Sequence, residues 1–363
     1  MFGSSSRERS GLQYAEAYLL YSSNPLYYNT DSDHKFKDEN DLKKIKFGVF
    51  LPSYALEFGE KETSSPFDRI KKLVLECERS GYDSIWLDDH LMLGKYPVLE
   101  CWTTLSALSS ITSKIRLGTM VLCNSFRNPA LLAKMAATLD VISNGRLEFG
   151  IGAGVAREEH VAYGIPFLKP PDRIRRMKEA VEIIKKLWTE EKASYQGKFY
   201  RINEAVCEPK PLQKPHPPIT IGGSGEKLTL KVAAQHADRY DWGHVPSLKL
   251  YKHKLKLLEN HCKTVGRDFH EIEKSCWSGG QIFIAQNQKE LDEKILQWKP
   301  KSVSLKDFKS LNLVGTPAVC RKKIRQYKSL GVTYFMLFFG DLPDMSGLRL
   351  YAKTVVKAMK STD

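Results

Sequence analysis

Four groups of residues that could take part in chemistry follow short apolar segments of this chain. His90 comes directly after a segment that ends in two aspartates, and Asn124 follows an apolar run at residues 115–122. Two glycine-rich loops, at residues 150–154 and 222–225, follow later apolar segments. A histidine can orient a ligand or relay a proton, and glycines let the backbone approach a ligand closely. A helix cap, a core histidine or a tight turn is the ordinary explanation of each group taken alone.

The second loop is the more informative one because it precedes a predicted helix. It consists of Gly222, Gly223, Ser224 and Gly225, followed by Glu226 and Lys227. Three glycines before a helix can present backbone N–H groups and the positive end of the helix dipole to an anion. Lys227 can add positive charge. The alternative is a glycine turn capped by Ser224, and the lack of a G-x-x-x-x-G-K-[ST] motif argues against a nucleoside triphosphate.

Metal and thiol chemistry have little support in the sequence. Carboxylates and a histidine stand near the first glycine loop, at Glu148, Glu158, Glu159 and His160, but without a metal-binding spacing such as H-E-x-x-H. The seven cysteines are scattered, odd in number and without a C-x-x-C pair. We interpret them as reduced core thiols of a cytoplasmic protein, and we expect neither a disulfide framework nor a metal site.

The elements that must position these residues alternate between strand and helix. The stretch at 115–167 reads as strand, helix, strand and glycine loop, and its helix begins at Pro129 and ends at Asn144-Gly145. Two parallel strands joined by one helix form a right-handed βαβ unit. Eight strands can be placed in this way, at residues 45–51, 82–87, 115–122, 146–150, 218–221, 239–242, somewhere within 278–285, and 332–339.

This alternation predicts an α/β fold, a (β/α)8 TIM barrel with insertions. A doubly wound sheet is the alternative, but eight parallel strands without a second domain disfavour it. One insertion is a small hairpin at 195–200, and residues 286–315 are expected to form one helix and a loop. The functional face of a TIM barrel is built at the carboxyl ends of its strands. His90, Asn124 and both glycine loops fall at such ends.

The first 44 residues differ in character from the rest. Residues 1–44 are rich in Ser, Asn and Tyr, and we expect a flexible or docking extension to a barrel domain at 45–363. The extension holds six Lys or Arg against seven Asp or Glu, so a formal charge of +14 for the chain leaves +15 for the barrel domain. A non-catalytic, polyanion-binding barrel could explain this charge. The lysines lack interleaved aromatic residues, however, and no apolar run could span a bilayer, so we expect neither a nucleic-acid nor a membrane partner.

Several segments together resemble the luciferase-like monooxygenase superfamily, and most closely its branch that depends on the deazaflavin coenzyme F420. They are GYDSIWLDDH, FRNPALLAKMAATLDVISNGRLEFGIGAG, EEHVAYGIPF and PPITIGGSGEKLTLKVAAQHAD. The resemblance implies a TIM barrel, commonly dimeric, that holds a flavin or deazaflavin in its mouth. We therefore expect a homodimeric, F420-dependent oxidoreductase that transfers a hydride to or from a small organic substrate. An FMN-dependent two-component monooxygenase is the alternative.

The resemblance also implies roles for single residues. His90 matches the histidine that faces the ring system and is the expected catalytic residue. Met120-Val121 matches a non-proline cis peptide that supports the ring, and the loop at 222–225 matches the one that holds the cofactor phosphate. Lys227 and other basic residues are expected to border the path of the anionic glutamate tail. The complete set of expected cofactor-binding residues is Asp89, Met120, Val121, Cys123, Gly152, Ala153, Gly154, Gly222, Gly223, Ser224 and Gly225.

Two positions depart from the pattern of sugar-phosphate-oxidising relatives. Val155 stands where those proteins carry a catalytic acid, and Gly94 stands where they carry a tryptophan. These differences argue against a sugar phosphate as the substrate and leave the substrate's identity open.

Overall fold

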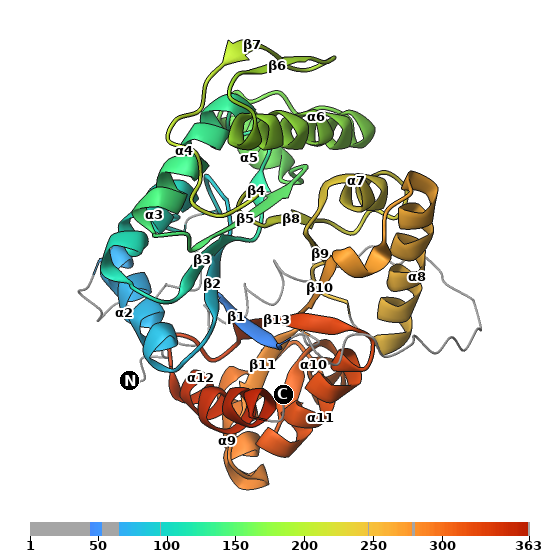
Figure 1. Cartoon of the computed structure of the whole chain (residues 1–363). Coiled ribbons are helices and arrows are strands. Elements are labelled where there is room, and N and C mark those ends of the chain that lie inside the picture. The colour runs from blue at the N-terminus through green and yellow to red at the C-terminus, as the bar shows by residue number, and fades with distance from the viewer. Residues whose placement is uncertain (1–43, 53–64, 95, 246, 278–279, 362–363) are drawn as a thin grey trace.

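The computed structural model describes residues 44–52, 65–94, 96–245, 247–277 and 280–361, and its centre is a closed barrel of parallel strands (Figure 1). The barrel closes because β1 pairs with β2 on one side and with β13 on the other. A doubly wound sheet has two open edges, so this closure excludes it. The strands in barrel order are β1 (Lys46–Phe50), β2 (Ser84–Leu87), β3 (Arg116–Thr119), β5 (Leu147–Gly152), β8 (Ile219–Gly222), β9 (Arg239–Asp241), β10 (Glu273–Cys276) and β13 (Val332–Phe339).

Helices cover the outside of the barrel, and several begin at caps that the sequence signals. Ser65 accepts a hydrogen bond from the backbone N–H of Asp68 at 3.1 Å, and Asn128 accepts one from Ala130 at 2.9 Å. A proline follows each cap, and its fixed φ suits the first helical position. The helices are α2 (Pro66–Arg79), α3 (Cys101–Ile111), α4 (Pro129–Ile142), α5 (Arg157–Ala162), α6 (Pro170–Thr189), α7 (Leu228–His236), α8 (Leu248–Val265), α11 (Pro317–Lys328) and a last helix in three parts, α12 (Ser346–Tyr351), η3 (Ala352–Val356) and α13 (Lys357–Lys360).

The seventh barrel strand is β10, which lies before the predicted position. Its sequence, EKSC, is mostly polar, so no apolar run marks it as a buried strand. Its glutamate is stabilised inside the protein, because Glu273 pairs with Arg239 at 2.6 Å. The predicted stretch instead holds β11 (Gln281–Ile284), which pairs with the carboxyl end of β13 and with β12 (Leu313–Gly315). The prediction for strand seven was therefore wrong in position.

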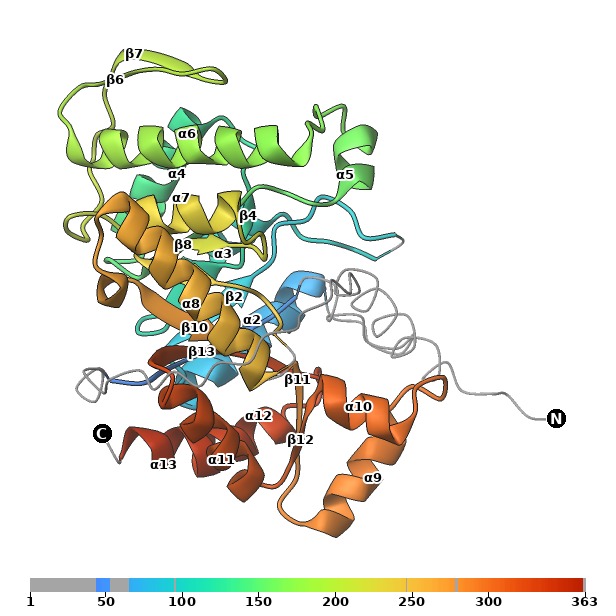
Figure 2. The same ribbon diagram turned by 90° about the vertical axis from the view of Figure 1, so that its right-hand side faces the viewer.

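The region at 286–315 forms more structure than the predicted single helix and loop. It contains two helices, α9 (Gln288–Trp298) and α10 (Leu305–Leu311), followed by β12. The helix α9 lies at the opposite end of the molecule from α6 (Figure 2). This insertion has an apolar cluster of its own, which explains why a short and charged sequence folds. Its buried members are Phe283, Ala285, Leu291, Ile295 and Phe308.

Other expectations concern the periphery of the protein. The predicted hairpin is confirmed, since β6 (Ala193–Gln196) and β7 (Arg201–Ala205) pair antiparallel. Each of the seven cysteines is buried, as expected for core thiols. The N-terminal extension lies outside the described residues, apart from Lys44. Over the described ranges, no helix has the length and apolar character that crossing a membrane requires.

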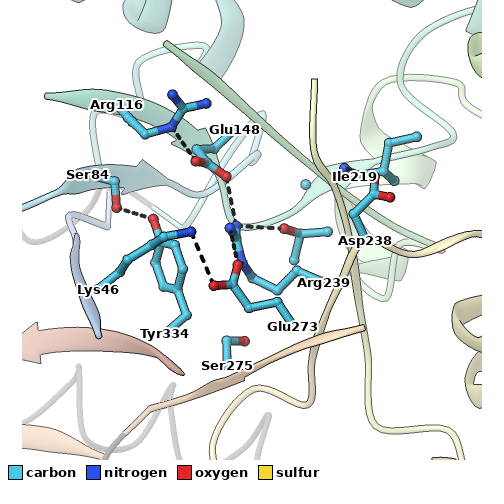
Figure 3. Close-up of polar contacts among 12 residues, drawn as sticks. Lys46, Ser84, Arg116, Glu148, Ile219, Asp238, Arg239, Glu273, Ser275 and Tyr334 are labelled. Carbon is cyan, nitrogen blue, oxygen red and sulfur yellow. Dashed lines mark hydrogen bonds and ion pairs between the residues drawn. The ribbon is translucent and has the colours of Figure 1, made fainter. Parts of the chain in front are cut away.

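A buried charge network closes the amino-terminal end of the barrel (Figure 3). Arg239 of β9 contacts Glu148 of β5 at 2.8 Å and Glu273 of β10 at 2.6 Å. Arg116 of β3 contacts the other oxygen of Glu148, and Lys46 lies 3.2 Å from Glu273. Burial raises the pKa of Glu148, but the two arginines outweigh burial and hold that pKa below its ordinary value. Buried charges are tolerated when they are paired in this way, so the network belongs to the framework.

Aromatic side chains fill the barrel between this network and the carboxyl ends of the strands. Trp86 of β2 is fully buried and meets Tyr334 of β13 edge-on, with ring centroids 5.8 Å apart. Gly48 and Gly118, on the two strands that flank β2, leave the space that the indole occupies, because a Cβ at either position would overlap it. The interior is therefore packed, and the mouth of the barrel is the place left for a ligand.

Candidate functional site

The residue groups that the sequence singled out come together on one side of the barrel mouth. Strands β2, β3, β5 and β8 are consecutive neighbours in the barrel. His90 follows β2, and Asn124 follows β4 (Leu122–Cys123), the short strand that comes after β3 and pairs with β5. The two glycine loops follow β5 and β8. Parallel strands end at the same edge of a barrel, so the predicted placement of the four groups on one face is confirmed.

His90 is held by a carboxylate that the sequence analysis did not assign to it. Nδ1 of His90 lies 3.0 Å and 3.1 Å from the two oxygens of Glu159, in the first turn of α5. Oε1 of Glu159 also accepts hydrogen bonds from the backbone N–H groups of Leu91 and Met92, at 3.0 Å and 3.1 Å. Glu159 therefore fixes both the imidazole and the turn that follows it. The His90 side chain keeps 25% of its surface exposed, so a bound molecule can reach it.

The surroundings of His90 favour its charged form. Burial lowers the pKa of His90, but the hydrogen bond to Glu159 and the charges of Asp88 and Asp89 outweigh burial and raise that pKa above its ordinary value. Burial raises the pKa of Glu159, but His90 and the backbone donors outweigh burial and hold that pKa below its ordinary value. The raised pKa of His90 and the lowered pKa of Glu159 both result from the ion pair that the two side chains form. The pair therefore favours an imidazolium at His90, and an imidazolium can donate a proton.

Asp89 links the loops that follow β2 and β4. Its carboxylate accepts hydrogen bonds from both terminal nitrogens of Arg127, at 2.7 Å and 2.9 Å, and from the backbone N–H of Cys123 at 2.8 Å. Arg127 also contacts Glu100, which caps α3. The Asp89 side chain is fully buried. We therefore interpret Asp89 and Arg127 as supports that fix the positions of His90 and Cys123, and Arg127 is a residue that the sequence analysis missed.

The Met120–Val121 peptide bond is cis, as the family resemblance implied. It lies between β3 and β4, and the Val121 side chain packs against glycines of two neighbouring strands. A Cβ at Gly152 would lie 2.6 Å from a methyl carbon of Val121, and a Cβ at Gly222 would lie 2.7 Å from one, both closer than real contacts allow. The packing of Val121 thus explains why these two positions are glycine, whether or not a ligand contacts their backbone.

The first glycine loop ends beside a buried thiol and imidazole. Gly154 has a φ of 77°, and Sγ of Cys123 fills the space that a Cβ there would need. Sγ of Cys123 lies 3.8 Å from Nε2 of His160, whose Nδ1 donates to the carbonyl of Ala156 at 2.7 Å. Burial raises the pKa of Cys123 to about 12, so the thiol is a neutral donor and a poor nucleophile. Ala153 is half-buried at the same edge.

The second glycine loop can be approached at its central turn. The backbone N–H of Gly223 donates to the carbonyl of Asp241 at 3.0 Å, so Gly223 is tied to the barrel edge. Gly223, Ser224 and Gly225 are exposed, and α7 begins after them at Leu228 without a side-chain cap. Ser224 therefore does not cap the helix, contrary to the simpler alternative. The exposed turn leaves its backbone within reach of an anion.

The remaining candidates have other surroundings. Glu148 lies in the charge network at the opposite end of the barrel, which corrects the expectation that it stands near the fourth loop. Glu158 and Lys227 are exposed, and Asn124 is buried with its amide 3.5 Å from the Tyr200 hydroxyl. Within the described part of the chain, no group of three or more His, Cys, Asp or Glu side chains could hold a metal ion.

A closed parallel barrel with a carboxylate-held histidine and glycine loops at its mouth defines a barrel enzyme scaffold with a ligand site at the strand ends. The family model for luciferase-like monooxygenases matches residues 45–302, which is more than half of the chain. The chain therefore belongs to the luciferase-like monooxygenase family.

Named relatives include both deazaflavin and flavin enzymes. An F420-dependent glucose-6-phosphate dehydrogenase of Microbacterium testaceum is 34% identical over 227 residues, which cover 60% of this chain and 66%, just under two thirds, of the relative. An FMNH(2)-dependent dimethylsulfone monooxygenase of Pseudomonas putida is 26% identical over 330 residues, covering 81% of this chain and 90% of the relative. A solved F420-dependent secondary alcohol dehydrogenase with an F420-acetone adduct has a TM-score of 0.70 at 22% identity, over 86% of this chain and 98% of that chain. The last similarity shows the shared fold.

Proposed function

We propose that this chain is an oxidoreductase that transfers a hydride between coenzyme F420 and a small organic substrate. The observation that carries the proposal is the His90–Glu159 pair, which favours a protonated imidazole at the mouth of the barrel. The end of β2 is joined to the cis Met120–Val121 segment, since the Met120 N–H donates to the carbonyl of Leu87 at 2.7 Å. The similarity to an F420-dependent dehydrogenase supports the choice of cofactor.

The residues present fit such a cofactor. We expect the Met120–Val121 segment, together with Ala153, to hold the ring, and the exposed Ser224–Gly225 turn to hold the phosphate through backbone N–H groups. A Cβ at Gly223 would approach Thr229 at 3.2 Å, and one at Gly225 would overlap the Thr229 hydroxyl at 2.7 Å, so the turn packs closely on Thr229 while Gly223, Ser224 and Gly225 stay exposed. The positive end of α7 adds to the attraction for an anion. When bound, F420 supplies or accepts the hydride at carbon 5 of its ring.

His90 would donate or accept the proton that accompanies the hydride. With Nδ1 hydrogen-bonded to Glu159, the imidazolium can give its Nε2 proton to the oxygen of a carbonyl substrate as that oxygen gains negative charge. In the opposite direction, neutral Nε2 takes the proton from an alcohol. Glu159 keeps the ring oriented and stabilises its positive charge. A hydride on carbon and a proton on oxygen together balance the reduction of a carbonyl group.

We propose that the substrate is uncharged. Val155 is 69% exposed where sugar-phosphate-oxidising members of the family carry an acid, and Val161 and Tyr163 are exposed nearby in the sequence. The Tyr163 hydroxyl donates to the carbonyl of Leu91 at 3.1 Å, which places it beside the loop that carries His90. An exposed Tyr163 beside this loop and a valine in place of an acid suit a neutral carbonyl or alcohol better than a phosphate ester.

Cofactor binding is the first test of the proposal. Oxidised F420 should bind with a dissociation constant in roughly the micromolar range, detected by its fluorescence. The flavin alternative is a two-component monooxygenase, which the resemblance to a dimethylsulfone monooxygenase favours. Reduced FMN reacts with oxygen, whereas the deazaflavin is a poor partner for oxygen. Oxygen uptake with reduced FMN, together with no binding of F420, would replace the proposal by this alternative.

A further inference from the structure

We propose that Lys254 of α8 is the positioning residue and the counter-charge of the anion-binding turn after β8. This inference rests on the proposed function, because the anion is the phosphate of the cofactor. Lys254 is a buried lysine, with 8% of its surface exposed. Its Nζ lies 3.3 Å from the carbonyl oxygen of Ser224 and 3.4 Å from Oε1 of Glu226. The sequence analysis had assigned the basic role here to Lys227, which is exposed.

The conformation of the turn depends on α8. Besides Lys254, His261 reaches it from the same helix, and Nε2 of His261 donates to the carbonyl of Glu226 at 2.8 Å. Nε2 of His253 lies 3.5 Å from Oε1 of Glu226. Three side chains of one helix thus hold residues 224–226, and Lys254 is the one that contacts the carbonyl of Ser224. Removing its ammonium group should loosen the turn that presents the backbone N–H groups.

Lys254 also offsets the negative charge that Glu226 brings to the turn. The carboxylate of Glu226 stands within the loop and would repel a phosphate, but Lys254 neutralises it. The helix α8 carries four more lysines, at Lys249, Lys252, Lys256 and Lys263, all of them exposed. Exposed charges are screened by solvent and salt. A buried charge acts through a lower dielectric, so Lys254 should influence the bound anion more than its neighbours do.

Lys254→Met tests this role through binding, independently of turnover. The probes are a phosphate-bearing cofactor that the wild type binds, F420 or FMN, and the matching ribityl compound without phosphate, which for FMN is riboflavin. The variant should lose at least about tenfold in affinity for the cofactor, because a charged donor is lost and Glu226 is left uncompensated. Affinity for the ribityl compound should stay nearly unchanged. Lys256→Met, on the exposed face of the same helix, should change cofactor affinity by less than about threefold.

Glu226→Gln separates the counter-charge from the positioning contact. This variant should bind the phosphate-bearing cofactor more tightly, and the double variant of Lys254→Met with Glu226→Gln should recover part of the lost affinity. Equal losses for the cofactor and the ribityl compound in Lys254→Met, or no loss for either, would overturn the inference while leaving the proposed function intact. If the wild type binds neither F420 nor FMN, the proposed function fails and the inference fails with it.

Discussion

Glu159→Gln should remove the proton-donating form of His90 while leaving the barrel folded. Glutamine has the shape of glutamate, and its carbonyl oxygen can still accept from the backbone N–H groups of Leu91 and Met92. Its carbonyl oxygen also stays within reach of Nδ1 of His90, but the negative charge is lost and the amide N–H group takes the place of the second carboxylate oxygen. The pKa of His90 should therefore fall, and a neutral imidazole is a far weaker acid.

The expected magnitude comes from the contacts that change. Loss of general acid help lowers turnover by about 10²–10⁴-fold. The stability cost should be no more than about 2 kcal/mol, because one charge-assisted hydrogen bond is replaced by a neutral one and the backbone bonds remain. Glu158 is exposed on the same turn of α5, so Glu158→Gln is the matched control and should change neither turnover nor stability.

The assay is the pH dependence of carbonyl reduction by reduced F420, with the free energy of unfolding measured in urea. The pKa of His90 is raised, so turnover in the wild type should be full below that pKa and fall as pH rises through it. In Glu159→Gln the fall should move to lower pH. A variant that loses turnover but keeps the wild-type pH profile would refute the role of Glu159 in holding the charged imidazole.

Four further outcomes concern His90 and the charge network. His90→Ala should lower turnover by about 10²–10⁴-fold with little change in melting temperature, and a variant that melts several degrees lower at an unchanged rate would make His90 structural. Arg239→Met should cost about 3–5 kcal/mol in urea unfolding because Glu148 and Glu273 lose a buried partner. Lys46→Met, which removes a partly exposed partner of Glu273, should cost less than about 1 kcal/mol, and equal costs would contradict the argument. Burial raises the pKa of Glu273, but Arg239 and Lys46 outweigh it and bring the pKa to about 2, so its stabilising contribution is complete above the ordinary glutamate pKa and is lost as pH falls toward 2. Unfolding free energies that stay constant through this acid range would argue against that contribution.

Most of the barrel could be predicted because buried parallel strands are short apolar runs. All eight residues of β13 are buried, and the predicted bounds match the observed ones. The strand β10 escaped prediction because a strand that contributes Glu273 to a buried charge network is polar. Residues 286–315 hold more structure than predicted because a separate apolar cluster stabilises two short helices there.

The candidate site was predictable in location and incompletely predictable in chemistry. His90 and the glycine loops could be placed because they follow strands directly. Glu159 and Lys254 could not be assigned to their partners, since each contact joins residues far apart in the sequence, 69 residues in the case of Glu159 and His90 and 30 in the case of Lys254 and Ser224. A glycine can be required because a ligand contacts its backbone or because a neighbouring side chain fills the space of a Cβ, and the sequence does not distinguish the two. At Gly222 the side chain of Val121 fills that space.

Hydride transfer to a bound deazaflavin can be followed directly with an isotope label. Oxidised F420 and the protein should be incubated with a panel of secondary alcohols that carry deuterium on the hydroxyl-bearing carbon. One deuterium from the alcohol should appear in reduced F420, and His90→Ala should slow this transfer strongly. Failure of the wild type to bind F420, together with oxygen consumption in the presence of reduced FMN, would contradict hydride transfer to F420.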